Sequence, residues 1–381
     1  MNIFDVYSVF DIEIAKAKGV TLWDNKGTSY MDLYGGHAVI SIGHSHPNYV
    51  EALTQQLQNI GFYSNSIKIP AQDKLAQKLG ELSGYPNYQL FLCNSGAEAN
   101  ENALKLASFH NARKKIISFT GAFHGRTSLA VAATDNPKII AHINETPNVC
   151  RLPFNDIERL EAEMDETVCA IIIEGVQGVG GVVIPTVSFL KKAEALCHKF
   201  GAVLILDEVQ SGYGRTGNFF AHQHAGIKPH IITVAKGMGN GFPIGGVLIA
   251  PEIHAKKELL GTTFGGNYLA CAAAIAVLEV IDKEQLIDNA QEVGNYLVAQ
   301  LQSLPHIKEI RAIGLMIGIE LDQPCAMIRN ELLFTHHIFT GSSSNKNTIR
   351  ILPSLAVTTA ELDVFISALK QILASIDKET L

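Results

Sequence analysis

The sequence has little positive charge and no long apolar run. Asp and Glu number 37 against 30 Lys and Arg, which gives a formal net charge of -7, and no segment concentrates the basic residues. Because binding to a phosphate backbone needs a basic surface, we expect no nucleic-acid partner. The longest apolar stretch, residues 271–281, contains Glu279 and is far shorter than the ~20 residues of a membrane span, so we expect no membrane partner.

Cysteine pairs and targeting signals are also missing. The six cysteines form no Cys-x-x-Cys pair and lie mostly in apolar runs, which is typical of reduced, buried thiols. Residues 1–19 carry acidic side chains early and have no apolar core like that of a secretory signal. These features predict a cytoplasmic protein.

Histidine occurs in two short clusters with metal-like spacing, at residues 44–46 and 222–224. Neither is accompanied by a His-Glu-x-x-His motif or a cysteine pair, and His124 has no partner four residues on. We therefore expect no metal site.

Apolar residues are abundant, at 47% of a chain of 381 residues, whereas charged residues make up 18%. This composition predicts a globular protein, and the length predicts two or three domains or one large one. Between residues 88 and 250, short β-rich apolar runs alternate with helical patterns, which is typical of a parallel α/β sheet covered by helices. We expect strands at residues 88–93, 115–119, 169–174, 202–207, 231–235 and 245–250, and helices at 97–111 and 188–200.

The two ends of the chain differ from this middle part. They combine amphipathic helices, at residues 285–304 and 359–376, with a few strands. We predict a small α+β domain formed by residues 1–60 and 270–381, and a large α/β domain formed by residues 61–269. Ligands of open α/β sheets bind beyond the carboxyl ends of the strands, so the residues that follow each strand are candidates for function.

A turn of small residues, Ser95-Gly96-Ala97, follows the first of these strands and opens a helix. Free backbone N–H groups and the helix dipole make such a turn an anion site that suits a phosphate. An ordinary helix cap, with Ser95 as the capping residue and Glu98 complementing the dipole, explains the same residues. Taken alone, the turn favours the ordinary cap.

Two charged residues end later strands. Asp207 closes the strand at 202–207, where a carboxylate would hold a pyridine nitrogen protonated, but Asp207-Glu208 also resembles the Mg²⁺-binding strand of P-loop ATPases. That alternative needs a Gly-x-x-x-x-Gly-Lys-Ser/Thr loop, which the sequence lacks. Lys236 follows the strand at 231–235 inside a glycine-rich turn, where it suits a Schiff base, and a solvated loop lysine accounts for it equally well.

The segment after the strand at 115–119 offers two further groups. Phe123 provides an aromatic face on which a ring stacks, and Arg126 provides a guanidinium for bidentate binding of a carboxylate. The Gly-x-Gly-x-x-Gly of nicotinamide enzymes and the Gly-x-Ser-x-Gly of serine hydrolases are both missing. Together the strand ends favour a phosphate-bearing cofactor with a basic heteroaromatic ring.

Five motifs occur in an order and spacing that resembles the class III (ω-amino acid) aminotransferases, which are fold type I pyridoxal-phosphate enzymes. They are SGAEAN, FHGRT, LDEVQSGYGRTG, AKGMGNGFPIGG and TTFGGN, and the similarity covers essentially the whole chain. The resemblance implies a large domain with a mostly parallel seven-stranded sheet flanked by helices, and pyridoxal 5'-phosphate as the cofactor. Within the class, FHGRT together with HAV and GHSHP most resembles the acetylornithine and succinylornithine aminotransferases.

The resemblance also implies roles for the cofactor-binding residues. Lys236 would be the Schiff-base lysine and would shuttle a proton, and Asp207 would pair with the pyridinium nitrogen. The other implied contacts are Ser95, Gly96 and Ala97 to the phosphate, Phe123 and Val209 to the two ring faces, Gln210 to the phenolic oxygen, and Thr263 of a neighbouring subunit to the phosphate. The last of these contacts implies a homodimer with shared active sites.

For the substrates, the resemblance implies that Arg126 binds the α-carboxylate of an N-acylornithine, with Thr262 nearby, and that Arg350 binds that of 2-oxoglutarate. Val179 replaces the glutamate that pairs with the distal arginine in most relatives. Arg350 should therefore be hydrated, bound to an anion or paired with another residue, and Glu174 is one candidate.

His37 is a second departure from the family pattern, at the expected substrate entrance. It would either recognise an acidic acyl group or serve as a structural hydrogen-bonding residue. The reaction implied is transfer of the δ-amino group of N-acetylornithine or N-succinylornithine to 2-oxoglutarate in arginine biosynthesis, giving the N-acyl glutamate semialdehyde and glutamate. Ornithine δ- and 4-aminobutyrate aminotransferases are the alternatives within the class, and a Mg-nucleotide ATPase is the alternative outside it.

Overall fold

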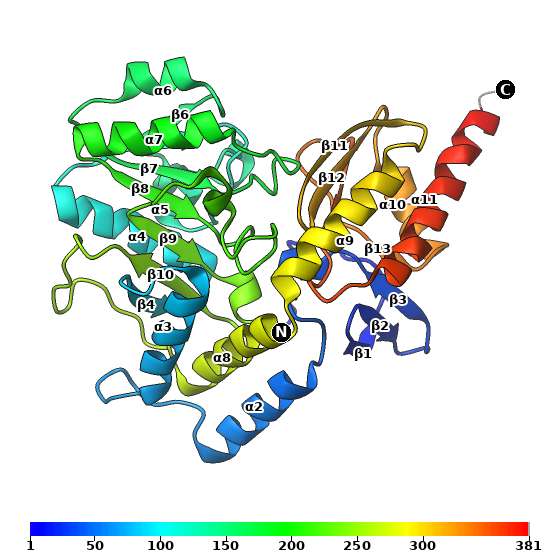
Figure 1. Ribbon diagram of the computed structural model, residues 1–381, viewed down its shortest axis with the longest axis horizontal. Coiled ribbons are helices and arrows are strands. Elements are labelled where there is room, and N and C mark those ends of the chain that lie inside the picture. The colour runs from blue at the N-terminus through cyan, green and yellow to red at the C-terminus, as the bar shows by residue number, and fades with distance from the viewer. Residues whose placement is uncertain (380–381) are drawn as a thin grey trace.

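The computed structural model describes residues 1–379, and its larger part is built on a seven-stranded sheet (Figure 1). The strand order is β4-β10-β9-β8-β7-β5-β6, and only β10 runs against its neighbours. The strands are β4 (Gln89–Cys93), β5 (Lys115–Phe119), β6 (Val149–Leu152), β7 (Val168–Glu174), β8 (Val203–Asp207), β9 (Ile231–Val234) and β10 (Gly245–Ile249).

The six expected strands are confirmed to within one residue, and β6 is an addition. It has only four residues, contains Arg151, and lies at the sheet edge beside β5. A short edge strand with a charged side chain has too little apolar pattern to be recognised in the sequence.

Helices cover both faces of this sheet because its strands are apolar on both sides. Ile171 and Leu204 pack in one cluster with Phe189 of the covering helix α7, whereas the adjacent Ile172 and Val203 pack in another cluster with α4. The helices of the chain are α1 (Gly35–Ala38), α2 (Pro47–Asn59), α3 (Pro70–Ser83), α4 (Gly96–Asn111), α5 (Ser128–Ala132), α6 (Ile157–Glu163), α7 (Val187–Phe200), α8 (Tyr268–Lys283), α9 (Leu286–Leu301), α10 (Ala326–Phe334) and α11 (Thr359–Glu379).

Four short 3₁₀ helices complete the helical elements of the described residues. They are η1 (Pro137–Ile139), η2 (His142–Asn144), η3 (Ala221–Ala225) and η4 (Lys236–Met238). Helix α7 ends as expected at Gly201, which adopts the left-handed conformation with φ 64°. No helix within residues 1–379 is long and apolar enough to cross a membrane.

Two smaller sheets come from the ends of the chain (Figure 1). One has the order β1-β2-β3-β13 and the other, antiparallel throughout, the order β11-β12-β14. Their strands are β1 (Ile14–Lys18), β2 (Thr21–Asp24), β3 (Ser29–Asp32), β11 (Ile307–Ile313), β12 (Met316–Leu321), β13 (Ile338–Phe339) and β14 (Thr348–Ile351). Both ends of the chain thus contribute to one region beside the large sheet.

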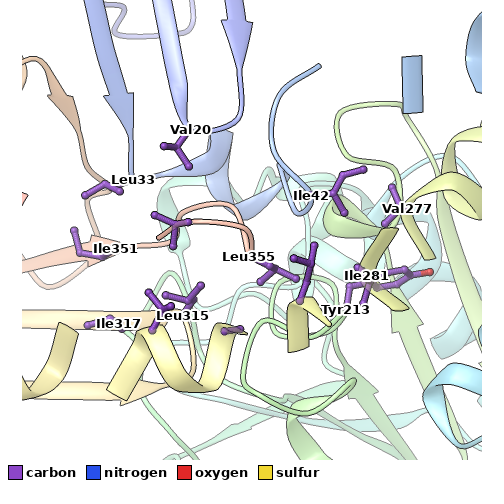
Figure 2. Close-up of a cluster of buried hydrophobic side chains, with 14 of the residues drawn as sticks. Val20, Leu33, Ile42, Tyr213, Val277, Ile281, Leu315, Ile317, Ile351 and Leu355 are labelled. Carbon is purple, nitrogen blue, oxygen red and sulfur yellow. The ribbon is translucent and has the colours of Figure 1, made fainter. Parts of the chain in front are cut away.

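A continuous core joins this region to the large one. Figure 2 shows Leu33, which directly follows β3, and Ile351 of β14 in the same buried cluster as Tyr213, which follows β8, and Ile281 of α8. The boundaries at residues 60 and 270 remain a prediction, since the two regions share apolar packing across them.

Candidate active site

A pocket of about 400 Å³ opens at the carboxyl ends of the central strands. Residues that follow β4, β5, β7, β8 and β9 all contribute to its lining, as expected for an open α/β sheet. Ten predicted site residues line it: Ser95, Gly96, Ala97, Phe123, Arg126, Glu174, Asp207, Val209, Gln210 and Lys236. The sheet therefore brings most of the predicted site together.

Asp207, the last residue of β8, lies buried in this pocket with a set of fixed hydrogen bonds. Its Oδ2 accepts from the Asn100 side-chain amide at 2.8 Å and lies 2.8 Å from His124 Nδ1, and its Oδ1 accepts from Val209 N–H at 3.0 Å. The Asn100 amide oxygen accepts in turn from the Thr233 hydroxyl at 2.7 Å. These bonds hold the carboxylate in one orientation.

His124 supports Asp207 and leaves one polar atom unused. Its side chain is fully buried, and its Nε2 has no hydrogen-bond partner among the described residues. A buried ring nitrogen without a partner is costly, so this atom is available to a bound molecule or an ordered water.

The amino end of α4 forms one side of the pocket. Ser95 caps the helix by accepting from Glu98 N–H at 3.1 Å, as the simple cap interpretation predicted, while the backbone N–H groups of Gly96 and Ala97 have no intrahelical acceptor. A Cβ at position 96 would lie 2.7 Å from Val209 Cγ1, so only glycine lets Val209 pack here. The cap and the anion site are thus compatible with each other.

Lys236 begins η4 and lines the same pocket as the carboxylates of Asp207 and Glu174. It is non-glycine with φ 43°, a conformation that costs energy and is frequent at functional sites. Burial lowers its pKa and nearby Arg350 adds to the effect, while Asp207 and Glu174 oppose it. A lowered pKa increases the fraction of free amine, the nucleophilic form of lysine.

Glu174 ends β7 and is also buried. Its carboxylate accepts from the backbone N–H groups of Phe123 at 2.9 Å and Gly178 at 3.3 Å. Burial, with a further contribution from Asp207, raises its pKa to about 7 despite the opposing effect of His124. The predicted candidate pairing with Arg350 is not formed, since no ion pair joins the two side chains.

Arg350, on β14, is 4% exposed and lies beside the pocket rather than in its lining. It donates to Gln210 Oε1 at 3.4 Å, to the Tyr34 hydroxyl at 3.3 Å and to the Ser342 carbonyl. The expectation that Arg350 pairs with another residue in place of the missing glutamate is consistent with these contacts. Gln210, predicted to reach the cofactor, here contacts Arg350 and the His37 carbonyl.

Three other predicted residues lie outside the pocket. Thr262 accepts a hydrogen bond from the Asn94 side chain at 3.1 Å but faces a separate depression near α3, and Thr263 is exposed. His37 is exposed in a left-handed turn, and its Nδ1 hydrogen bonds the Tyr34 hydroxyl. Within one chain these three side chains are therefore not part of the pocket.

The structure speaks against the ATPase alternative. Glu208 is not among the residues that line the pocket. Its Oε2 accepts from the Ser211 hydroxyl and the Ala221 N–H, and its Oε1 accepts from the His222 N–H and lies 2.7 Å from His222 Nδ1. This carboxylate stabilises the start of η3 and is not available for Mg²⁺. The two histidines with metal-like spacing at residues 44–46 are also used in the protein itself, since His44 hydrogen bonds Asp32 and His46 hydrogen bonds Glu284.

Sequence reasoning missed several residues that shape the site. Asn100 and His124 support Asp207, and Asn240 accepts from the Ser41 and Ile42 N–H groups and so ties the lysine loop to residues 41–43. Asn100 lies four positions after Gly96, on the same helix face, and this spacing was a usable signal. Tyr34 had no such signal, because only the fold brings it to Arg350.

Comparison with known proteins identifies the family. A family model described as aminotransferase class-III matches residues 5–373. The chain belongs to the class III aminotransferases. Acetylornithine aminotransferases from Bacillus cereus and Bacillus subtilis are 40% and 41% identical to it, each alignment covering 98% of this chain and 98% of the relative.

Solved structures agree with this class III assignment. The ornithine aminotransferase of Toxoplasma gondii ME49 superposes with a TM-score of 0.91 at 30% identity, covering 99% of this chain and 93% of that one. A thermostable (S)-enantioselective omega-transaminase from Thermomicrobium roseum gives 0.87 at 30% identity, covering 96% and 92%. The predicted family and fold class are confirmed.

The residues of this class III pocket fit pyridoxal 5'-phosphate. The free N–H groups at the start of α4 suit its phosphate, the buried Asp207 suits a protonated ring nitrogen, and Lys236 suits its aldehyde. Phe123 and Val209 supply apolar contact for the ring. His124 Nε2, which also lies at the pocket, has no hydrogen-bond partner among the described residues and is therefore available to a bound group.

Proposed function

We propose that the protein transfers the δ-amino group of N-acetylornithine or N-succinylornithine to 2-oxoglutarate, giving the N-acyl glutamate semialdehyde and glutamate in arginine biosynthesis. The observation that carries the proposal is the pocket in which Lys236, Asp207 and the start of α4 converge beside Arg126. The acetylornithine aminotransferases that align over 98% of the chain support the choice of substrate.

Pyridoxal 5'-phosphate is the cofactor, and when bound it serves as the electron sink for carbanion chemistry. In the proposal Gly96 and Ala97 donate backbone N–H groups to the phosphate, with Ser95 beside them. Asp207, fixed by Asn100 and His124, keeps the ring nitrogen protonated. Phe123 and Val209 hold the ring between them, and Gln210 reaches its phenolic oxygen.

Lys236 has two roles in the proposal. Its amine would hold the cofactor, and it would carry the proton that moves at the substrate carbon. Burial lowers its pKa, so the free amine is more accessible than in an ordinary lysine. Glu174 lies beside it and is protonated part of the time, with a pKa of about 7.

The two substrates need two carboxylate sites in alternation. We assign the acylornithine α-carboxylate to Arg126, which is exposed at the pocket mouth, and the 2-oxoglutarate α-carboxylate to Arg350. In the proposal His37, which is exposed and contacts Tyr34, belongs to the substrate entrance. A planar bidentate donor suits each carboxylate.

A homodimer with shared sites completes the proposal. Thr262 and Thr263 lie outside the pocket of their own chain, next to Phe264, whose exposed ring packs 5.3 Å from that of exposed Phe62. An exposed aromatic pair of this kind is typical of a surface that a second subunit covers. A cytoplasmic location is also part of the proposal, supported by the six free thiols.

Initial rates with four amino donors test the function. With 2-oxoglutarate as acceptor, kcat/KM for N-acetylornithine or N-succinylornithine should exceed that for ornithine and 4-aminobutyrate by on the order of tenfold or more. The reason is that a substrate without the acyl group leaves any pocket group that binds the acyl group without its partner, at a cost of about 1–3 kcal/mol. A preference for free ornithine or 4-aminobutyrate would contradict the proposed substrate.

A further inference from the structure

The guanidinium of Arg350 is buried without a carboxylate partner, which is costly unless other groups hold it. Among residues 1–379 it forms no ion pair, and burial lowers its pKa. Its Nε–H donates to the Ser342 carbonyl, one Nη donates to Gln210 Oε1 and the other to the Tyr34 hydroxyl. All three acceptors are uncharged, so the positive charge is held in place without being neutralised.

Tyr34 contacts this guanidinium in two ways. Its hydroxyl oxygen accepts from Nη2 at 3.3 Å, and the guanidinium carbon lies 5.7 Å from the centre of its ring, within the range of a cation–π interaction. Gly341 pairs with Arg350 through two backbone hydrogen bonds of 2.9 Å and makes room for the ring, since a Cβ there would lie 2.4 Å from Tyr34 Cε2. The backbone around Arg350 is thus shaped to admit Tyr34.

His37 determines the direction of the Tyr34 hydroxyl. Arginine has no acceptor, so the hydroxyl oxygen accepts from Arg350 and its own proton is free for His37 Nδ1. Although the residue as a whole is exposed, partial desolvation of its ring lowers the pKa of His37, and the charges of Arg350 and Lys236 lower it further, which favours the neutral imidazole whose Nδ1 is able to accept. The chain of donors therefore runs from Arg350 through Tyr34 to His37.

The three contacts leave a definite pair of donors unused. Of the five guanidinium N–H groups, one goes to Ser342, one to Gln210 and one to Tyr34. One N–H then remains on each terminal nitrogen, so the guanidinium keeps donors for a carboxylate.

We propose that Tyr34 is a positioning residue which orients the Arg350 guanidinium toward a substrate carboxylate, with His37 fixing the direction of the Tyr34 hydroxyl. The inference rests on the proposed function, in which Arg350 binds the α-carboxylate of 2-oxoglutarate. An aromatic hydroxyl suits this task because it orients the guanidinium without competing with the substrate for its charge.

Binding of glutarate, a non-reacting five-carbon dicarboxylate, to the holoenzyme tests the inference. Tyr34→Phe keeps the ring and removes the hydroxyl, so calorimetry should show a Kd for glutarate raised about 3- to 10-fold, the usual effect of one lost hydrogen bond. In single-turnover kinetics, the apparent Kd for 2-oxoglutarate should rise equally, whereas the limiting rate and the acylornithine half-reaction should stay within about twofold.

Two further sets of variants separate positioning from a structural effect. Tyr30→Phe removes a hydroxyl that bonds Asp24 at 3.3 Å, away from the pocket, and should leave the Kd for glutarate unchanged. His37→Asn keeps an acceptor and tolerates the φ of 69°, so it should bind glutarate like the native enzyme, whereas His37→Ala should resemble Tyr34→Phe. If Tyr34→Phe does not fold, the comparison of His37→Asn with His37→Ala tests the inference in its place.

The outcomes distinguish failure of the inference from failure of the proposed function. If Arg350→Lys weakens glutarate binding and Tyr34→Phe does not, the positioning role of Tyr34 is wrong and the role of Arg350 stands. If Arg350→Lys leaves the Kd for glutarate unchanged, Arg350 is not the dicarboxylate site, and both its proposed role and the positioning role of Tyr34 are wrong. Equal damage to both half-reactions in Tyr34→Phe would also overturn the inference.

Discussion

The two sides of the active-site pocket are built from different kinds of structure. The cofactor side consists of groups at strand ends, Asp207 on β8, Glu174 on β7 and Lys236 after β9. The substrate side consists of residues from distant parts of the chain, Arg350 and Tyr34, which are 316 positions apart. Parallel strands bring the groups of the first side to one edge of the sheet, whereas the packing of the two ends of the chain brings Tyr34 to Arg350.

The two sides also differ in charge. The cofactor side carries two buried carboxylates, which favour a protonated ring nitrogen and an ammonium group. The substrate side carries the guanidinium of Arg350 with uncharged partners only, which favours a carboxylate. This difference teaches that the large sheet presents the groups that suit the cofactor, whereas the two ends of the chain together present the group that suits a carboxylate.

The largest expected effect is on the cofactor side. Lys236→Ala should lower kcat by a factor on the order of 10³ or more, because the proton-transferring amine is removed. Lys228→Ala, a lysine outside the pocket whose ammonium lies over the Tyr88 ring, is the matched control and should keep native activity. Near-native transamination by Lys236→Ala would show that another residue does this work.

The two arginines should divide the substrates between them. Arg126→Lys should raise the apparent KM for the acylornithine, and Arg350→Lys that for 2-oxoglutarate, each by about 10- to 100-fold, since a lysine cannot make the bidentate contact. Stopped-flow measurement of each half-reaction separately checks this. Impairment of both half-reactions by one variant would mean that a single arginine serves both carboxylates.

Introducing a carboxylate on the substrate side should have a smaller effect. Val179 lines the pocket, and Val179→Glu should give Arg350 an internal partner that competes with 2-oxoglutarate. The apparent KM for 2-oxoglutarate should rise between a few-fold and ~100-fold, since an ion pair between the new carboxylate and Arg350 is worth on the order of 1–3 kcal/mol at most. Val179→Gln, which adds bulk without charge, should raise it much less, and equal values for the two variants would refute the competition.

The smallest effect concerns stability and Glu174. Its pKa is about 7 in the folded chain against an ordinary value of 4.5, so the native state binds more protons than the unfolded state between these pH values. The contribution of Glu174 to the free energy of unfolding should therefore be fully present below about pH 4.5. It should decrease as the pH rises to about 7, by on the order of 1–3 kcal/mol.

Glu174→Gln should remove this part of the pH dependence. Urea unfolding of the cofactor-free protein at pH 5 and pH 8 measures it, because a neutral amide contributes no proton uptake. Parallel pH profiles for the native protein and the variant would mean that Glu174 titrates normally.

The cofactor side of the pocket is predictable from the sequence, whereas much of the substrate side is not. The central strands are short runs of almost entirely apolar residues, and the residues just after them are recognisable as a candidate site, because parallel strands present their carboxyl ends together. Asp207 and Lys236 were found this way. Tyr34 and its contact with Arg350 were not, because they depend on how the chain ends pack beside the sheet. The predicted role of Thr263 in a partner's site stays a prediction, because the described chain leaves this residue exposed outside its own pocket.

The most direct test of the central claim is to identify the lysine that carries the cofactor. The holoenzyme is treated with borohydride, digested, and its peptides are mapped by mass spectrometry. The account predicts a pyridoxyl group on Lys236 alone, at the end of β9 and beside Asp207 and Glu174. Labelling of any other lysine, with Lys236 unmodified, would contradict the account.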